Sequence, residues 1–292
     1  MTFSIVARSS DCVSFGVAVA SKFLAVGAVV PAARVGVGAL ATQSYANTAY
    51  RAEGLRLLAE GGKAPAVVGM LTSSDEQREL RQVGMVDAAG GSATYTGTGC
   101  HPWAGGRGGD GYAVQGNILT GEEVVAEIER AWLAAPPEQP LARRLLSALA
   151  AGDVAGGDRR GRQSAALFVV TPRGGYAGGD DVQVDLRVDD HRAPVTELGR
   201  LLDLHDLYFT TTDPTALVPV QGGVLAQLRD ALGELGYRVA DGTAATVMAA
   251  LEEWAGRENL EKRVAHGAMV DPVVLRMLQS RAGTTQHLDA VP

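Results

Sequence analysis

This sequence has few cysteines, few lysines and no excess of positive charge, and each of these features excludes a class of protein. Two cysteines in 292 residues, Cys12 and Cys100, cannot build a disulfide framework, and neither belongs to a pair with zinc-ligand spacing. This usage favours a reducing, cytoplasmic location. Only three lysines are present, and 33 acidic against 26 basic side chains give a formal charge of −7. Because such a surface repels phosphate backbones, we expect no nucleic acid partner.

Long apolar runs are also missing. The longest, residues 23–35, is broken by Gly27, Pro31 and Arg34, whereas a membrane-spanning helix needs about 20 apolar residues. The first residues have neither the basic segment nor the apolar run typical of a secretory signal. Still, 46% of the residues are apolar, which is enough for a large buried core. We therefore expect a globular protein of about two domains without membrane contact.

The expected elements run in the order strands, helices, strands. Period-2 apolar patterns predict strands over 2–8, 13–20, 25–30, 35–42, 82–86, 93–97, 167–171 and 182–188. Helical spacing predicts helices between residues 44 and 61 and over 64–73, 122–133 and 141–150, and the glycine-laden segment 97–111 is predicted as a loop. This order, with short turns between strands, favours an antiparallel α+β sandwich over a parallel βαβ sheet.

The composition shifts near residue 212. From there on, apolar spacing predicts helices over 225–235, 243–256 and 273–280. We therefore predict a domain over 1–212 and a small helical domain over 213–292.

Thr2 is the candidate with the most chemistry. A small second residue permits removal of the initiator methionine, which would leave a threonine with a free α-amine at the start of a strand. The α-amine has an ordinary pKa of about 7.7 to 8.0, so a nearby cation or burial can make it a general base for the hydroxyl beside it. One residue then supplies both nucleophile and base. The alternative is that Thr2 simply begins a strand.

The segments around Thr2 resemble a known group of enzymes. Residues 2–8, 15–23 and 35–43 resemble the opening of N-terminal-nucleophile hydrolases. More closely, residues 2–209 are similar to the family catalogued as domain of unknown function 1028, on the stretches 17–31, 41–47, 114–117, 157–164 and 185–191. The resemblance implies an αββα sandwich with the nucleophile at the end of a central strand. It implies no particular substrate.

The same resemblance suggests roles for residues around the nucleophile. Lys22, just after the second strand, or Arg34, just before the next, would lower the pKa of the terminal amine by charge repulsion. Asp158 and Ser164, in a helix-to-strand loop, are the residue types that hold this amine in threonine peptidases such as proteasome β subunits, although their spacing is wider here. As alternatives, Lys22 is a solvated strand end and Arg34 a surface loop residue.

Polar residues at strand ends are the candidates for substrate binding. Gln115 and Asn117 offer amide donors to an oxyanion or a substrate amide, while Asn117 could instead cap a turn. Gln43 and Asn47, at a strand-to-helix transition, allow the same two interpretations. Arginines at 159, 160 and 162 could bind a carboxylate, with Arg159 and Arg160 as candidates, or could pair with the protein's own acids.

Three further patterns carry weaker signals. Asp185 and Arg187 lie on one face of a predicted strand, so a salt-bridge ladder is favoured over a metal site, and we expect no metal. Cys100 and His101 are adjacent, and neighbouring side chains on an extended chain point apart, which disfavours a nucleophilic pair. The glycines at 105–109 lack the flanking strand, helix and lysine of a nucleotide-binding loop, so we expect no cofactor.

Residues 224–237 and 241–254 resemble a small helical module of the peptidoglycan-binding type. A cell-wall fragment is therefore one candidate partner, and packing or homo-oligomerisation is the alternative role. For the whole chain, the sequence predicts an amidohydrolase acting on a small amide, peptide or ureido substrate through an acyl-enzyme on Thr2. The alternative, of a different class, is a non-catalytic binding protein for an anionic metabolite on the same fold. We expect a homo-oligomer in either case.

Overall fold

The computed structural model describes residues 2–265 and 267–288, and the chain divides into two compact units, residues 1–202 and 203–292. The boundary predicted from composition, between residues 212 and 213, stays a prediction. Among the described helices we find none with the length and apolar character that a transmembrane span requires.

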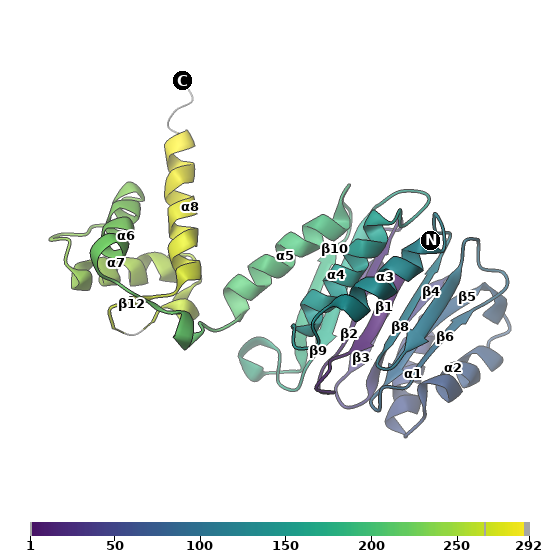
Figure 1. The fold of residues 1–292 in the computed structure, drawn as a ribbon. Helices are drawn as coiled ribbons and strands as arrows, with labels where there is room; N and C mark the ends of the chain where they lie inside the picture. The colour runs from purple at the N-terminus through teal and green to yellow at the C-terminus, as the bar shows by residue number, and fades with distance from the viewer. Residues whose placement is uncertain (1, 266, 289–292) are drawn as a thin grey trace. The chain divides into compact units, whose positions relative to one another are not determined.

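Two antiparallel sheets form the centre of the first unit (Figure 1). The larger has the order β10-β9-β2-β1-β8-β7 and the smaller β3-β4-β5-β6. The strands are β1 (Thr2–Arg8), β2 (Phe15–Ser21), β3 (Pro31–Arg34), β4 (Gly38–Ser44), β5 (Arg81–Asp87), β6 (Ser92–Thr96), β7 (Gly105–Gly109), β8 (Tyr112–Asn117), β9 (Ser164–Val170) and β10 (Val182–Val188). Strands β1 and β2 are buried on both faces, since their apolar runs supply side chains to two cores at once.

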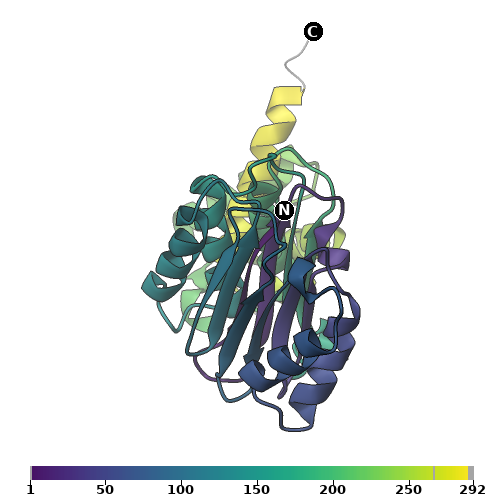
Figure 2. The same ribbon diagram turned by 90° about the vertical axis from the view of Figure 1, so that its right-hand side faces the viewer.

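Helices cover the outer face of each sheet, as the turned view shows (Figure 2). The helices of this unit are α1 (Ala49–Ala59), α2 (Ala64–Ser73), α3 (Glu123–Ala134) and α4 (Leu141–Val154), and α5 (Pro194–Phe209) begins in it. Helices α3 and α4 pack on the six-stranded sheet and α1 and α2 on the four-stranded sheet. The layers are therefore αββα, and the predicted antiparallel α+β sandwich is confirmed.

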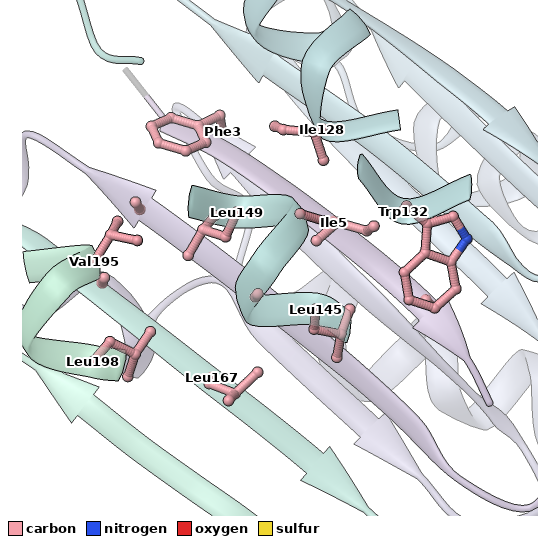
Figure 3. Packing of buried hydrophobic residues seen from close by; sticks show 14 of the residues in the cluster. Phe3, Ile5, Ile128, Trp132, Leu145, Leu149, Leu167, Val195 and Leu198 are labelled. Carbon is pink, nitrogen blue, oxygen red and sulfur yellow. The ribbon is translucent and has the colours of Figure 1, made fainter. Parts of the chain in front are cut away.

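The core beneath α3 and α4 shows why β1 has its alternating sequence. Phe3 and Ile5 point from β1 toward Leu149 and Ile128 of these helices (Figure 3). Thr2, Ser4 and Val6 alternate with them, so they face the second sheet. Thr2 is thus fixed on the inner face of the sandwich.

Two predicted segments have a different structure. Residues 25–30 form no strand: the segment holds a 3-10 turn, η1 (Val26–Ala28), because Gly27 packs against β9, where an added Cβ would lie 2.5 Å from the Cβ of Ala166. The predicted loop over 97–111 contains strand β7, whose glycines let it pair closely with β8 at the sheet edge. Helix α5 was not predicted.

The second unit is helical, with α6 (Gly222–Glu234), α7 (Ala244–Arg257), α8 (Pro272–Leu288) and a small β11 (Val218–Pro219) and β12 (Met269–Val270) pair. Its own apolar core surrounds Trp254 and Leu228. A buried Arg263–Asp271 ion pair, 2.9 Å from Nη1 to Oδ2, fixes the segment before α8. The predicted helices over 225–235, 243–256 and 273–280 are all present.

Candidate functional site

Thr2 lies within a row of polar side chains that crosses one end of the six-stranded sheet. In the strand register it pairs with Asn117 of β8 on one side and with Ser21 of β2 on the other, and Ser21 pairs with Ser164 of β9. The Thr2 hydroxyl Oγ1 lies 3.2 Å from Ser21 Oγ, within hydrogen-bond distance. Four neighbouring strands therefore bring hydroxyl and amide side chains to the same end of the sheet.

A cavity of about 480 Å³ opens at this end of the sheet. The start of β1, the end of β2 and the turn after β2 form one part of its wall. The end of β4, the start of β5 and the loop before β9 form the rest. The lining residues are Thr2, Ser21, Phe23, Val26, Val29, Val30, Gln43, Ser44, Tyr45, Ala46, Arg81 and Arg160. This volume is within the range of small-molecule sites.

Beneath the cavity, a hydrogen-bonded network of buried amides joins the two sheets. Ser4 Oγ donates to Gln43 Oε1 at 2.7 Å and accepts from Gln115 Nε2 at 2.6 Å. Gln82 Oε1 accepts from Gln43 Nε2 at 2.8 Å and from Asn117 Nδ2 at 2.9 Å. These hydrogen bonds restrict the arrangement of the side chains, and Gln115 Oε1 is the one buried side-chain atom of the network without a partner in the part of the chain that the structure describes.

The network reaches Thr2 through its backbone. Gln43 Nε2 donates to the Thr2 carbonyl oxygen at 3.2 Å, and Asn117 Nδ2 does so at 3.5 Å. The position of the candidate nucleophile is therefore set by side chains of the facing strand β4 as well as by its own sheet.

The turn after β2 is held in place by two predicted site residues. Asp158 Oδ2 accepts from the Lys22 N–H at 2.6 Å, and its side chain is only 2% exposed. Ser164 Oγ donates to the Phe23 carbonyl at 2.5 Å and accepts from the Val26 N–H at 3.1 Å. Both residues thus fix the apolar wall of the cavity, and neither lines it.

Five other predicted residues lie in the cavity wall, in the network beneath it or beside Ser21. Gln43 and Arg160 line the cavity, and Gln115 and Asn117 belong to the network beneath it. Lys22 is next to Ser21, and its Nζ donates to the Arg162 carbonyl at 3.4 Å.

Three further predicted residues neither line the cavity nor take part in the network beneath it. Arg34 pairs with Gly38 at the opposite end of the β3–β4 hairpin from Gln43, about 17 Å away along the strand. Asn47 lies two residues before α1, and its Oδ1 accepts from the Ala49 N–H at 3.1 Å. The backbone N–H of Arg159 donates to the Ile118 carbonyl at 3.3 Å.

Arg81, which sequence reasoning missed, holds the opposite wall. Its guanidinium bonds Asp75 Oδ2 at 3.0 Å, Gln77 Oε1 at 2.8 Å and the Tyr45 carbonyl. The charged hydrogen bond from Arg81 holds the pKa of the Asp75 carboxyl well below its usual range. Beside them Ser44 has a positive φ of 66°, an uncommon conformation for a non-glycine residue.

Ser4, Ser21 and Gln82 were also missed, although the signal was present. Each stands at a period-2 position of a strand that also has buried apolar residues facing the second sheet. A polar residue at such a position is buried between the sheets and needs partners. The three residues would have been found by applying this rule to every strand end.

The weaker patterns have structural roles. Arg187 pairs with Asp185 at 2.9 Å, as the salt-bridge interpretation predicted. Burial raises the pKa of the Cys100 thiol, which disfavours the thiolate form that a nucleophile needs. Within residues 2–265 and 267–288, no group of three or more His, Cys, Asp or Glu side chains is placed to hold a metal ion.

Comparison with known proteins gives two family matches. The model described as "Family of unknown function (DUF1028)" matches residues 2–198, and the one described as "Putative peptidoglycan binding domain" matches residues 208–278. The crystal structure of protein SPO2555 from Silicibacter pomeroyi, itself assigned to DUF1028, is 29% identical with a TM-score of 0.63 and covers 70% of this chain and 89% of that one. No curated protein matches. The resemblances to DUF1028 and to a peptidoglycan-binding module are confirmed.

Proposed function

We propose a function for this chain, which belongs to the family of unknown function DUF1028. It is an N-terminal-nucleophile hydrolase that cleaves a small amide, peptide or ureido substrate through an acyl-enzyme on Thr2. The observation that carries this proposal is the position of Thr2, which starts a central strand and lines a cavity of about 480 Å³. A terminal threonine in this place would present its hydroxyl and its α-amine to the same bound substrate.

The reaction follows from the two groups of one residue. Once Met1 is removed, the α-amine accepts the proton of Oγ1 as Oγ1 attacks the substrate carbonyl carbon. The tetrahedral intermediate collapses as the amine leaving group takes the proton back, and an ester on Thr2 remains. Water, deprotonated by the same α-amine, then hydrolyses the ester and restores the hydroxyl.

The surrounding residues support this chemistry by position. Ser21 Oγ, 3.2 Å from Oγ1, can orient the hydroxyl, and Gln43 fixes the Thr2 carbonyl at 3.2 Å. Asp158 and Ser164 are positioning residues, because they hold the turn that carries Lys22 and Phe23. Lys22, one residue from Ser21, is the candidate cation for lowering the pKa of the amine by charge repulsion.

The test uses two substitutions of Thr2 that are both small enough to allow removal of Met1. Thr2→Val keeps the shape but removes the hydroxyl, so we expect turnover of a panel of small amides to fall by roughly 10⁴-fold with folding unchanged. Thr2→Ser keeps the hydroxyl and should retain activity within about tenfold. Intact mass must show loss of Met1 in active protein. Full activity with Met1 attached, or in the valine variant, would overturn the proposal.

A second candidate function rests on the charge of the cavity. Two guanidinium groups, of Arg81 and Arg160, line it, which favours a binding protein for an anionic metabolite. An electrophile directed at amide-cleaving nucleophiles separates the two functions. A covalent adduct on Thr2, seen by intact mass and lost in Thr2→Val, supports the hydrolase, and its absence supports the binding protein.

The helical unit supports one further partner. Because residues 208–278 match a peptidoglycan-binding family, we propose a cell-wall fragment as its ligand. Co-sedimentation of the full chain with isolated peptidoglycan tests this, with recovery in the supernatant as the contradicting result.

A further inference from the structure

The wall of the Thr2 cavity has two chemically different sides. Phe23, Val26, Val29 and Val30, all from the turn after β2 and its continuation, give an apolar side. Phe23 is 52% exposed, so this side extends to the cavity mouth. Thr2 and the amide of Gln43 belong to the polar side. A ligand that fits both sides has an apolar group and a polar group a short distance apart.

The two arginines of the wall have different surroundings. The Arg81 side chain is 12% exposed, and its guanidinium already bonds the Asp75 carboxylate, the Gln77 side chain and the Tyr45 carbonyl. Its charge is therefore balanced within the protein. Its function is to hold the Tyr45 side of the wall.

Arg160 is placed differently. Its side chain is 46% exposed, and its Nη2 lies 3.1 Å from the Lys22 carbonyl oxygen and 3.5 Å from Asp158 Oδ2. Both Asp158 oxygens already accept shorter backbone hydrogen bonds, from Lys22 N–H at 2.6 Å and Arg160 N–H at 2.8 Å. The contact with Lys22 keeps the guanidinium one residue from Ser21, the strand partner of Thr2.

Thr2 and Arg160 line the same cavity, and the Lys22 carbonyl that accepts from Arg160 belongs to the residue after the strand partner of Thr2. A molecule with a carboxylate on the carbon next to an amide nitrogen can therefore place its amide carbon at Thr2 and its carboxylate at Arg160. In such a molecule the hydroxyl would lie about 3 Å from the amide carbon, and the guanidinium about 2.8 Å from the carboxylate.

We infer that the substrate is an N-acylated amino acid or a short peptide with a free α-carboxylate next to the cleaved amide. Arg160 binds the carboxylate, and the apolar side chain of the amino acid packs on Phe23, Val26 and Val30. This inference rests on the proposed function for the reaction, and names the substrate class and the residue that selects it.

Two probes isolate the carboxylate. N-acetyl-L-leucine and N-acetyl-L-leucinamide share the acetyl amide and the apolar side chain, and only the first carries the charge. We expect the wild-type chain to bind and cleave the first about ten to a hundred times better, the ratio that a charged hydrogen-bond pair gives. Arg160→Gln should reduce this ratio to near one. Arg162→Gln, a control of equal exposure whose guanidinium pairs with Asp153, should leave it unchanged.

Binding is measured calorimetrically on the Thr2→Val variant, and hydrolysis on the wild type, so that the two proposals fail separately. Binding that prefers the carboxylate and depends on Arg160, without hydrolysis, would keep this inference and contradict the hydrolase. Equal hydrolysis of both probes would keep the hydrolase and overturn the inference. A preference that survives in Arg160→Gln, or no binding of either probe at millimolar concentration, would also overturn it.

Discussion

The space between the two sheets has two halves of opposite chemistry. At one end the inward side chains are apolar, among them Val6, Val17 and Ala39. At the other end the same strands present hydroxyls and amides, and the list is Thr2, Ser4, Ser21, Gln43, Gln82, Gln115 and Asn117. Strands β1, β2, β4, β5 and β8 all change from apolar to polar at this end, because alternate strands run in opposite directions and each contributes its matching terminus.

This difference teaches that the polar half is not required for packing. Apolar side chains fill the first half, and they could fill the second at lower desolvation cost, since buried polar groups need complete hydrogen bonding. The polar half borders the cavity and fixes Thr2. The comparison therefore separates a half that stabilises the sandwich from a half that builds a site, and the predictions below test that separation.

Gln82 is the strongest test, because it makes the most hydrogen bonds in the polar half. Its amide accepts from Gln43 and Asn117 and donates to Thr96 Oγ1 at 2.9 Å and to the Gly116 carbonyl at 2.7 Å. Gln82→Leu leaves these buried partners unsatisfied, so we expect a loss of about 3 kcal/mol or more in the free energy of unfolding, measured by urea denaturation.

The reciprocal change in the apolar half is the control. Val17→Thr keeps the side-chain shape and adds a hydroxyl to the apolar cluster that contains Val6 and Ala39, so we expect a loss of about 1–3 kcal/mol. A polar side chain in the apolar half and an apolar side chain in the polar half should thus both destabilise the fold. A Gln82→Leu protein as stable as the wild type would show that the two halves are interchangeable in the fold.

Gly84 marks the border between the halves on β5 and gives the next largest effect. A Cβ at this position would lie 1.8 Å from Gln115 Oε1, an atom without a hydrogen-bond partner among the described residues. Gly84→Ala must displace Gln115 and its bond to Ser4, so we expect a loss of about 1–3 kcal/mol by denaturation. Gly69→Ala, on an exposed helical site with no atom within 4 Å, should instead be neutral or stabilising by about 0.5–1 kcal/mol. Equal effects at both glycines would contradict the role of Gly84.

The apolar half could be predicted from the sequence and much of the polar half could not. Alternating apolar residues identified β1, β2, β4 and β5, and helical spacing of apolar residues identified α1 and α2. Thr2, Gln43, Gln115 and Asn117 were also singled out. Gln82 and Ser21 were not, because a polar residue at a strand terminus is expected to face water; their period-2 positions in apolar strands indicate burial only when a facing sheet is assumed.

Roles that depend on tertiary contacts were the hardest to assign. Asp158 and Ser164 were expected beside the terminal amine by family resemblance, yet the contacts that the structure shows for them are with the turn over residues 22–26. Arg34 is close to Thr2 in sequence but the β3–β4 hairpin carries it to the far end. Strand β7 was missed because its glycines carry no hydrophobic pattern, and pairing with β8 alone makes them a strand.

Substitution of Asp75, at the margin of the polar half, should give the smallest change in the free energy of unfolding and the one that depends most on pH. Its carboxylate accepts from Arg81, from Asn47 at 2.9 Å and from Tyr50 at 2.8 Å, and these bonds, that of Arg81 first, hold its pKa below the ordinary value of 3.8. A depressed folded-state pKa contributes stability that is complete above the unfolded pKa and is lost as the pH falls toward the folded one.

We therefore expect Asp75→Asn to lower the free energy of unfolding by about 1–2 kcal/mol at pH 7. Below about pH 4 the difference in this free energy between variant and wild type should narrow, as measured by denaturant titrations over pH 2–8. Asp110→Asn, on a carboxylate that is 91% exposed, is the control and should stay within about 0.5 kcal/mol of the wild type at pH 7. A gap for Asp75→Asn that widens in acid would mean that Arg81 holds the wall beside Tyr45 without its carboxylate partner. In that case the charge of Arg81 would be available to the cavity together with that of Arg160, and the selectivity assigned to Arg160 would be shared between them.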